Sequence, residues 1–332
     1  MPKIKEPIIP SLSELKSVSE LCLMENPYVN FEDTDTLFVD AMKESVSWHY
    51  KRNRFYQKLI DSEDYKNDEL VDIDGIEKVP FILSNFFKYH EVKSIPDEEV
   101  YLHLTSSGTT GQKSQIFFDE WTIKSAQKMV DSIFKSYGWS SEVSTNYLLF
   151  TYEPEEGSKL GTAYTDNFLC KYAPINEVRY GIRYLGEKDG HKFDVFGCIE
   201  ALKKFEELGD PVRIFGFPSF FYFTLSKMKE LGMEPLKLNK DSLVFLGGGW
   251  KGHQDKAISK TDFYSLCEEM LGIPNERLRD GFGSVEHCIP YVECEKHNFH
   301  IPIWSRVLIR DVQSLEALPD GEIGYLNLIS PY

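Results

Sequence analysis

The sequence has no apolar run long enough to cross a membrane, and its first ten residues lack the apolar segment of a secretory signal. Cysteine is also sparse, because the six cysteines are mostly scattered along 332 residues, as in reduced cytosolic proteins. The chain contains no internal repeat and no low-complexity tract. These absences argue against stable membrane insertion and a disulfide scaffold, and they favour a soluble cytoplasmic enzyme.

Basic residues are too few to balance the acidic ones, and the formal net charge is −16. Broad capture of nucleic acid or of an anionic membrane surface requires charge of the opposite sign. A nucleotide can still bind, since a few local donors outweigh the distant field at contact range. Aromatic residues make up 14% of the chain, which indicates a folded protein. We therefore expect a folded enzyme with no nucleic-acid partner.

The order of helix-like and strand-like segments predicts three parts. Residues 1–98 form a helical N-terminal region, with a short helix capped by Ser11 or Ser13 and a longer helix over 35–60. Residues 99–300 alternate strands with helices, which implies an α/β core with a largely parallel sheet. Residues 301–332 are rich in strand-forming residues, with a turn at Pro319-Asp320-Gly321.

Hydrophobic periodicity places individual elements within the α/β core and the β-rich end. Strands are expected over 147–151, 212–216, 242–246, 277–280, 305–310 and 322–329, and helices over 120–137, 194–208, 219–231 and 261–271. The chain ends at Tyr332, directly after the last expected strand, with no capping helix or polar tail. We therefore expect a truncated or partial chain.

The segment 105–113, with the sequence TSSGTTGQK, is the strongest functional signal. Its small side chains let backbone N–H groups close on an anion, and Lys113 adds a positive charge. It follows residues 100–104, which suit a buried strand, and α/β proteins commonly hold nucleotide phosphates in a polar loop after a strand. The alternative is a surface turn. The expected phosphate-binding residues are Thr105, Ser106, Ser107, Gly108, Thr109, Thr110, Gly111 and Lys113.

Two further glycine-rich segments also follow apolar strands. Gly247, Gly248 and Gly249 would let a flat ligand approach the backbone, unless they only form a tight strand-to-helix turn. Phe282 beside Gly283 can lie against a purine or an acyl chain. Glu286 offers a hard oxygen ligand suited to Mg²⁺ beside phosphates, although a Glu-His pair in a loop is commonly a surface pair. The three loops together favour the functional interpretation.

Two other groups of residues are candidates for binding. Six aromatic residues lie within 214–223, where most are expected in the core, while Phe217 and Phe220 are expected to line an apolar pocket, with Trp250 stacking or packing nearby. A Cys-x5-Cys-x2-His-x2-His spacing supplies four ligand types that could close a zinc site, although it departs from common finger spacings. These candidate zinc ligands are Cys288, Cys294, His297 and His300. A buried thiol and ordinary loop histidines are the competing interpretation, and Cys294 is also a candidate nucleophile.

Together these segments resemble the adenylate-forming enzymes, which include acyl-CoA synthetases, firefly luciferase and phenylacetate–CoA ligases. Residues 106–111 with Lys113 resemble that superfamily's phosphate loop, and 247–249 and 282–286 resemble its adenine-flanking glycines and its aromatic-Gly-x-x-Glu motif. More closely, 105–114, 247–251 and the stretch from 285 through 312 resemble the LuxE-type acyl-protein synthetases. Those are the fatty-acid-activating subunits of the fatty acid reductase of luminous bacteria, and the resemblance runs from about residue 35 to the end.

The resemblance implies the large N-terminal domain of an adenylate-forming, acyl-CoA synthetase-like enzyme, with a helical N-terminal part and a β-rich end. It implies ATP-dependent activation of a fatty acid as acyl-adenylate, transfer to a protein thiol, and an acyl reductase subunit as partner. Thr109, Lys113 and Glu286 would be catalytic, with Glu286 holding Mg²⁺. Residues 247–249, Phe282 and Gly283 would border the adenine.

The sequence departs from the family pattern in two ways. The spacing between Gly111 and Lys113 is one residue shorter than in much of the superfamily, which often has a proline there. The ribose-binding aspartate, the C-terminal lysine region and the acyl-carrying cysteine are expected beyond Tyr332. Two other functions therefore stay open. One is an acyl- or aryl-CoA ligase of the phenylacetate type, and the other is an inactive adenylate-binding or scaffold subunit.

Overall fold

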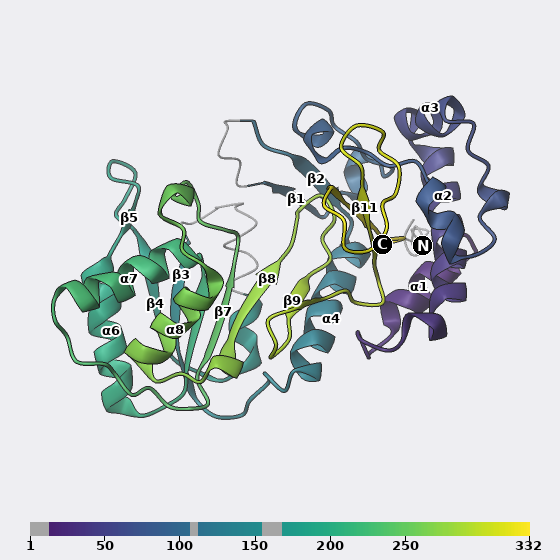
Figure 1. The fold of residues 1–332 in the computed structure, drawn as a ribbon. Coiled ribbons are helices and arrows are strands. Elements are labelled where there is room, and N and C mark those ends of the chain that lie inside the picture. Colours follow the sequence, from purple (N-terminus) through teal and green to yellow (C-terminus); the bar gives the residue numbers. More distant parts are fainter. Residues whose placement is uncertain (1–12, 107–111, 155–167) are drawn as a thin grey trace, which may run out of the picture. The chain divides into compact units, whose positions relative to one another are not determined.

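The computed structural model describes residues 13–106, 112–154 and 168–332 (Figure 1). It divides into two compact units. The first unit comprises Met1–Ser136, Ser284–Pro290 and Ile301–Tyr332, and the second comprises Tyr137–Gly283 and Tyr291–His300. The predicted boundaries at residues 98 and 300 follow sequence order, whereas the contacts gather three separate segments into the first unit.

The second unit is built on one sheet, whose described strands follow the order β10-β9-β8-β7-β6-β3-β4-β5. Strands β8, β7, β6, β3 and β4 are parallel, and β5, β9 and β10 extend the edges antiparallel. The largely parallel sheet is as predicted. The strands are β3 Thr145–Tyr152, β4 Ile175–Tyr184, β5 His191–Phe193, β6 Val212–Gly216, β7 Leu243–Gly247, β8 Leu278–Phe282, β9 Tyr291–Glu293 and β10 Phe299–His300.

Three helices of the second unit share a hydrophobic core with one face of this sheet. They are α6 (Val195–Leu208), α7 (Pro218–Glu230) and α8 (Lys260–Leu271), and Figure 1 shows them beside the strands. Because strand residues alternate between faces, every second residue joins this core, as Leu148, Phe150 and Ile214 do. Ser259 is the N-cap residue of α8, and its side chain accepts a hydrogen bond from the Asp262 N–H.

The first unit contains helices α1 (Lys16–Leu23), α2 (Asp35–Arg52), α3 (Arg54–Ser62) and α4 (Glu120–Ser136). The single helix expected over 35–60 is wrong. At Asn53 the backbone is extended, and its side chain accepts a hydrogen bond from the Tyr56 N–H, so it ends one helix and caps the next. The predicted cap at Ser13 is also wrong, because the N-cap residue of α1 is Leu15. The other predicted cap, Ser11, lies outside the described residues.

Two small antiparallel sheets complete the first unit. Strands β1 (Leu102–Thr105) and β2 (Gln115–Phe118) form one, and β11 (Arg306–Arg310) and β12 (Tyr325–Ile329) form the other. The pairing of β11 with β12 confirms the hairpin expected at the β-rich end. Helices predicted over 120–137, 194–208, 219–231 and 261–271 match α4, α6, α7 and α8 within one residue at each end. No helix of the described residues combines the length and apolarity needed to span a bilayer.

Long-range contacts tie the ends of the first unit together. The Arg306 guanidinium donates to Asp35 Oδ1 at 2.6 Å and lies 4.0 and 4.3 Å from the ring centres of Phe31 and Phe38. The Trp304 indole N–H donates to the Leu21 carbonyl at 3.0 Å. The last strand region is therefore packed into the same core as the first two helices.

Candidate functional site

The structure brings two of the predicted glycine-rich segments together in the second unit. Strands β7 and β8 are parallel neighbours in which Gly247 pairs with Gly281, so the loop after β7 begins beside the end of β8. A Cβ atom on Gly247 would lie 3.1 Å from the Gly281 carbonyl oxygen. The carboxyl ends of parallel strands are where open α/β sheets usually bind ligands, and both segments lie there.

The loop after β7 has a backbone that few side chains tolerate. Gly248 and Gly249 have φ of 77° and 67°, and Lys251 and Gly252 have φ of 42° and 80°. A Cβ on Gly248 would approach the Phe217 ring to 3.0 Å, whereas a Cβ on Gly249 would meet nothing within 4 Å. The first position therefore needs glycine for its conformation and for space, and the second only for its conformation.

The predicted pocket residues belong to one aromatic cluster at this end of the sheet. Phe217 is buried at the N-cap of α7, with its ring 6.3 Å from Phe220, and the Lys251 ammonium lies 4.6 Å from the Phe217 ring centre. Trp250 belongs to the same cluster through Tyr222, because the ring centres of Trp250 and Tyr222 are 5.4 Å apart. The cluster packs beside the glycine loop, and the pocket role expected for Phe217, Phe220 and Trp250 stays a prediction.

Phe282 and Gly283 end strand β8. Phe282 pairs with Tyr291 of β9, and the two ring centres are 5.8 Å apart. Phe282 keeps 39% of its surface exposed, and a Cβ on Gly283 would meet nothing within 4 Å. Part of the Phe282 side chain is therefore open to solvent at the end of β8.

The segment predicted to bind phosphates belongs to the first unit and lies between two antiparallel strands, rather than between a strand and a helix as in a parallel α/β unit. Thr105 pairs with Gln115, and the Ser106 hydroxyl accepts a hydrogen bond from the Ser114 N–H at 2.9 Å. Ser106 N–H in turn donates to the Ser114 carbonyl at 3.1 Å, which closes the base of the loop. Lys113 is exposed. The predicted residues Ser107, Gly108, Thr109, Thr110 and Gly111 lie outside the described residues.

Glu286 sits in a tight turn that also belongs to the first unit. Its carboxylate accepts a short hydrogen bond from the Ser284 hydroxyl, and the Ser284 carbonyl accepts from Cys288 N–H at 2.7 Å. Burial lowers the pKa of the neighbouring His287 to about 4 and raises that of the Cys288 thiol to about 11. Burial therefore favours the uncharged forms of the two residues that follow Glu286.

The predicted zinc site is not formed. Among the residues that the structure describes, which include all four predicted ligands, no three His, Cys, Asp or Glu side chains are grouped to hold a metal ion. His297 instead lies 2.6 Å from the Asn275 side-chain oxygen, and Cys294 sits in the turn between β9 and β10. Cys288 belongs to the first unit, whereas Cys294, His297 and His300 belong to the second. The spacing arises from a hairpin turn rather than from a ligand set.

Sequence reasoning missed a buried ionic cluster around Glu293 in β9. The Glu293 side chain is fully buried and accepts hydrogen bonds from the Lys260 ammonium, the Tyr264 hydroxyl and the Asp280 N–H. No local motif marks it, because its partners lie 13 to 33 residues away. The one available signal was a carboxylate in a short apolar strand segment.

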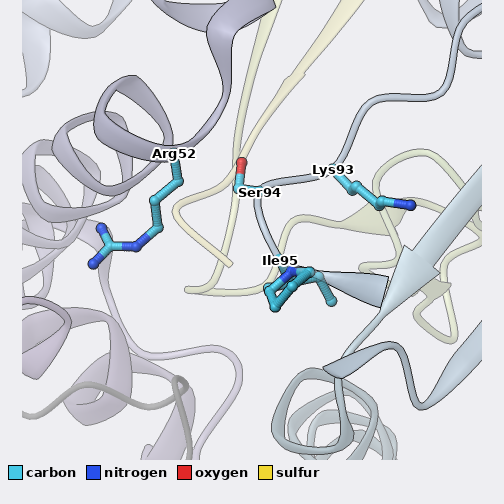
Figure 2. Close-up of a pocket in the computed structure, with 5 residues that line it drawn as sticks. Arg52, Lys93, Ser94 and Ile95 are labelled. Atoms are coloured by element: carbon cyan, nitrogen blue, oxygen red, sulfur yellow. The ribbon is translucent and has the colours of Figure 1, made fainter. Parts of the chain in front are cut away.

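The first unit also has a cavity of about 390 Å³ (Figure 2), lined by Arg52, Lys93, Ser94, Ile95 and Pro96. Its two cations point in different directions in Figure 2, and both are paired, Arg52 with Glu14 at 2.7 Å and Lys93 with Glu91 and Asp97. The Ser94 hydroxyl lies 2.6 Å from His49 Nδ1. None of the predicted site residues is among those that line it.

Comparisons with known proteins agree on family and fold. The family model for acyl-protein synthetase, LuxE, matches residues 5–332. The long-chain-fatty-acid–luciferin-component ligase of Aliivibrio fischeri is 26% identical, over 93% of this chain and 79% of that protein. The protein of the same name from Vibrio harveyi is 24% identical with the same coverage.

Solved structures give the fold. The 2-hydroxyisobutyryl-CoA ligase in complex with 2-HIB-AMP and CoA superposes with a TM-score of 0.67 at 9% identity. The match covers 93% of this chain, and the chain spans about 65% of the length of that ligase. A long-chain-fatty-acid-CoA ligase from Archaeoglobus fulgidus gives a TM-score of 0.50 at 12% identity, over 73% of this chain and 44% of that ligase. The likeness confirms the predicted α/β fold of adenylate-forming ligases.

Proposed function

The chain belongs to the LuxE acyl-protein synthetase family, and on that premise we propose that it activates a long-chain fatty acid with ATP and passes the acyl group to a protein thiol. In the first step a carboxylate oxygen of the fatty acid bonds to the α-phosphorus, and pyrophosphate leaves. In the second step a thiolate attacks the acyl carbon and AMP leaves, which gives a thioester. The observation that carries the proposal is the family match over nearly the whole chain, on a ligase fold.

In this proposal the loop 105–111 and Lys113 bind the ATP phosphates, with Thr109 as a catalytic donor. A carboxylate and a triphosphate repel each other, so the attack needs donors and cations that neutralise the developing charge. The hairpin closed by Ser106 and Ser114 supports this role, because it presents a small-residue loop from two paired strands. Exposed Lys113 can reach a ligand without breaking a buried contact.

The proposed adenine and acyl sites lie on the second unit. The glycines 247–249 and the pair Phe282 and Gly283 would border the adenine, since the register of β7 and β8 places the two segments side by side. The aromatic cluster that includes Phe217, Phe220 and Trp250 would receive the apolar part of the fatty acid. The accessible ring of Phe282 and the crowded contact of Gly248 with Phe217 support these roles.

Glu286 is the proposed Mg²⁺ ligand. Its carboxylate has the hard oxygen donors that this ion prefers, and Ser284 orients it through a hydrogen bond. When bound, the ion would supply charge neutralisation beside the phosphates.

The nature of the acceptor separates the first function from a second candidate. Relatives named as ligases of a luciferin component favour a protein acceptor, and an acyl reductase in the cytoplasm would then consume the thioester. The likeness to CoA ligases favours the alternative, an acyl- or aryl-CoA ligase of the phenylacetate type. In that case free CoA replaces the protein thiol.

The test is to incubate the protein with ATP, Mg²⁺ and radiolabelled myristate. Fatty-acid-dependent pyrophosphate exchange supports adenylation, and label retained on protein identifies a protein acceptor. Acyl-CoA formed only when CoA is added supports the second candidate. Absence of exchange would overturn adenylation and favour an inactive adenylate-binding subunit.

Glu286→Ala tests the metal assignment, with exposed Glu295→Ala as the matched control. Loss of exchange in the first variant alone is expected. Exchange at the unaltered rate in Glu286→Ala would overturn the assignment of Glu286 to Mg²⁺.

A further inference from the structure

Glu293 is a fully buried carboxylate that connects three elements of the second unit. From β9 it accepts hydrogen bonds from Tyr264 OH of α8 at 2.9 Å and from Asp280 N–H of β8 at 3.0 Å. Lys260, in the first turn of α8, forms a close ion pair with it. The Glu293 side chain therefore joins two strands and a helix through one charged group.

The cluster extends to a second carboxylate. The Lys260 ammonium also lies 3.4 Å from Asp280 Oδ2, so one cation serves two acids. Burial raises the pKa of Asp280, and it raises the pKa of Tyr264, which stays protonated and donates to Glu293. His297 adds a ring nitrogen 3.5 Å from Glu293. Tyr264, Asp280 and His297 therefore each contact Glu293 or Lys260 directly.

The position of the cluster in the chain gives it a role beyond stability. The chain leaves the second unit after Gly283 and returns at Tyr291, and Phe282 pairs with Tyr291 at the base of this excursion. Gly281 pairs with Val292 in the same ladder, and Asp280 and Glu293 are the next residue on each strand. The ionic cluster therefore sits at the base of the loop 283–290, which carries Glu286 and follows Phe282.

We propose that Glu293 is a positioning residue for the adenylation site: with Lys260 and Tyr264 it fixes the paired ends of β8 and β9 at the base of the loop 283–290, and so orients Phe282 toward the nucleotide. This inference rests on the proposed function for the role of Phe282. The geometry of the base itself belongs to the second unit and is independent of that function.

The chemistry of the cluster supports positioning rather than simple stabilisation. Glu293 is fully buried, whereas its partner Lys260 keeps 40% of its side chain exposed. Burying the carboxylate is costly, and apolar side chains of similar volume often stabilise a fold as well or better. Unlike an apolar side chain, a buried carboxylate with three hydrogen-bond donors holds the groups that it contacts in one defined arrangement. Here those groups are the backbone of β8, next to the ligand-facing residues, and two side chains of the helix behind it.

The test compares Glu293→Gln with the unaltered protein in steady-state fatty-acid-dependent pyrophosphate exchange. Gln keeps the size of the side chain but loses the charge that Lys260 requires. We expect KM for ATP to rise and kcat/KM for ATP to fall on the order of 10- to 100-fold, as for residues that orient a first contact layer, while KM for the fatty acid stays unchanged. A variant that only destabilises the fold lowers the active fraction and leaves both KM values unaltered.

Asp194→Asn is the matched control in the same unit. Asp194 caps α6 through Gly197 N–H and pairs with Arg179, but it lies outside the loop base. It should lower the melting temperature without changing KM for ATP. An unchanged KM for ATP in Glu293→Gln would overturn the proposal.

Hydrogen exchange tests the positioning role without relying on activity. In Glu293→Gln the amides of residues 281–291 should exchange faster than in the unaltered protein, whereas Asp194→Asn should leave them unaltered. If the unaltered protein shows no pyrophosphate exchange, the proposed function fails and this measurement alone decides the positioning. Unchanged protection of 281–291 in Glu293→Gln would then overturn it.

Discussion

The two units of the molecule are stabilised in different ways. The second unit is almost continuous in sequence, and its parallel strands alternate with the helices that cover them. The first unit gathers three distant segments, and single side chains such as Arg306 and Trp304 join residues more than 270 positions apart. Apolar alternation therefore builds one unit, whereas a few long-range polar contacts close the other.

This difference has a chemical consequence. In the first unit Arg306 and the neutral histidines His49 and His287 contact distant segments of the chain, so this unit should respond more strongly to the loss of one of these side chains and to acid. The second unit places a fully buried carboxylate, Glu293, next to the proposed site. Changes there should affect ligand binding before they affect folding.

The largest expected effect comes from Arg306→Met in the first unit. This change leaves Asp35 partly buried without its partner and removes a cation between two rings. Breaking a buried pair from one side costs about 3–5 kcal/mol. Chemical denaturation with hydrogen exchange should show the first unit opening while the sheet of the second keeps its protection.

The exposed pair of Arg52 with Glu14 is the control within the same unit. Arg52→Met should cost about 1 kcal/mol or less, because exposed ion pairs contribute little. If Arg306→Met and Arg52→Met lowered the free energy of unfolding equally, the buried contacts of Arg306 would not explain why the first unit is sensitive to the loss of one side chain.

The same contrast explains how far the sequence predicts the fold and the site. The alternating part was predicted well because strands such as β6 and helices such as α7 are marked by their own apolar periodicity. Strand β4 was missed, since its residues 175–180 are mostly exposed or half-buried and show no apolar run. The break of the first long helix depends on a single capping side chain, Asn53, within an otherwise helical pattern.

Motifs that act through the backbone were visible in the sequence, and contacts made at long range were not. The glycines 247–249 can be read from the sequence, and the structure pairs Gly247 with Gly281 of the neighbouring strand. Glu293 has no local signature, because burial and its three donors arise only from the pairing of β8 with β9 and the packing of α8. The cysteine and histidine spacing misled, because a hairpin turn produces the same pattern as a zinc ligand set.

Acid provides the second way to separate the two units. Burial lowers the pKa of His49 and of His287, both in the first unit, to about 4. Because these folded pKa values lie below the unfolded value, the unfolded chain takes up protons first, and stability falls as pH drops from about 6.5 to about 4. The loss is on the order of 3 kcal/mol per histidine, at about 1.4 kcal/mol per pKa unit.

The second unit should respond in the opposite direction through Asp280. Its pKa is raised by burial, so the folded form takes up a proton at a higher pH than the unfolded form, and acid adds stability there. Hydrogen exchange, corrected for intrinsic rates, should show the first unit opening before the second below pH 6. Simultaneous opening, or no change after His49→Gln, would contradict the assignment.

A smaller effect distinguishes two adjacent glycines of the second unit. Alanine at Gly249 must adopt a left-handed backbone, which costs roughly 1–2 kcal/mol, and it meets no neighbour. Alanine at Gly248 bears the same backbone cost and also approaches the Phe217 ring to 3.0 Å. We expect about 2–3 kcal/mol for Gly248→Ala from urea denaturation, since overpacking adds to the strain. Equal losses of unfolding free energy in the two variants would mean that the Phe217 ring moves aside at no cost in stability.

The smallest predicted effect compares one helix cap from each unit. Ser259 caps α8 in the second unit and is exposed, so Ser259→Ala should cost about 1 kcal/mol, the usual value for a lost cap. Asn53 caps α3 in the first unit, and its buried amide also donates to the Lys93 carbonyl at 3.1 Å. Asn53→Ala should therefore cost more, about 2 kcal/mol, because it also leaves the half-buried Lys93 carbonyl without that donor. Thermal and urea denaturation of both variants measure the difference, and a larger loss for Ser259→Ala would reverse the proposed contrast between local and long-range stabilisation.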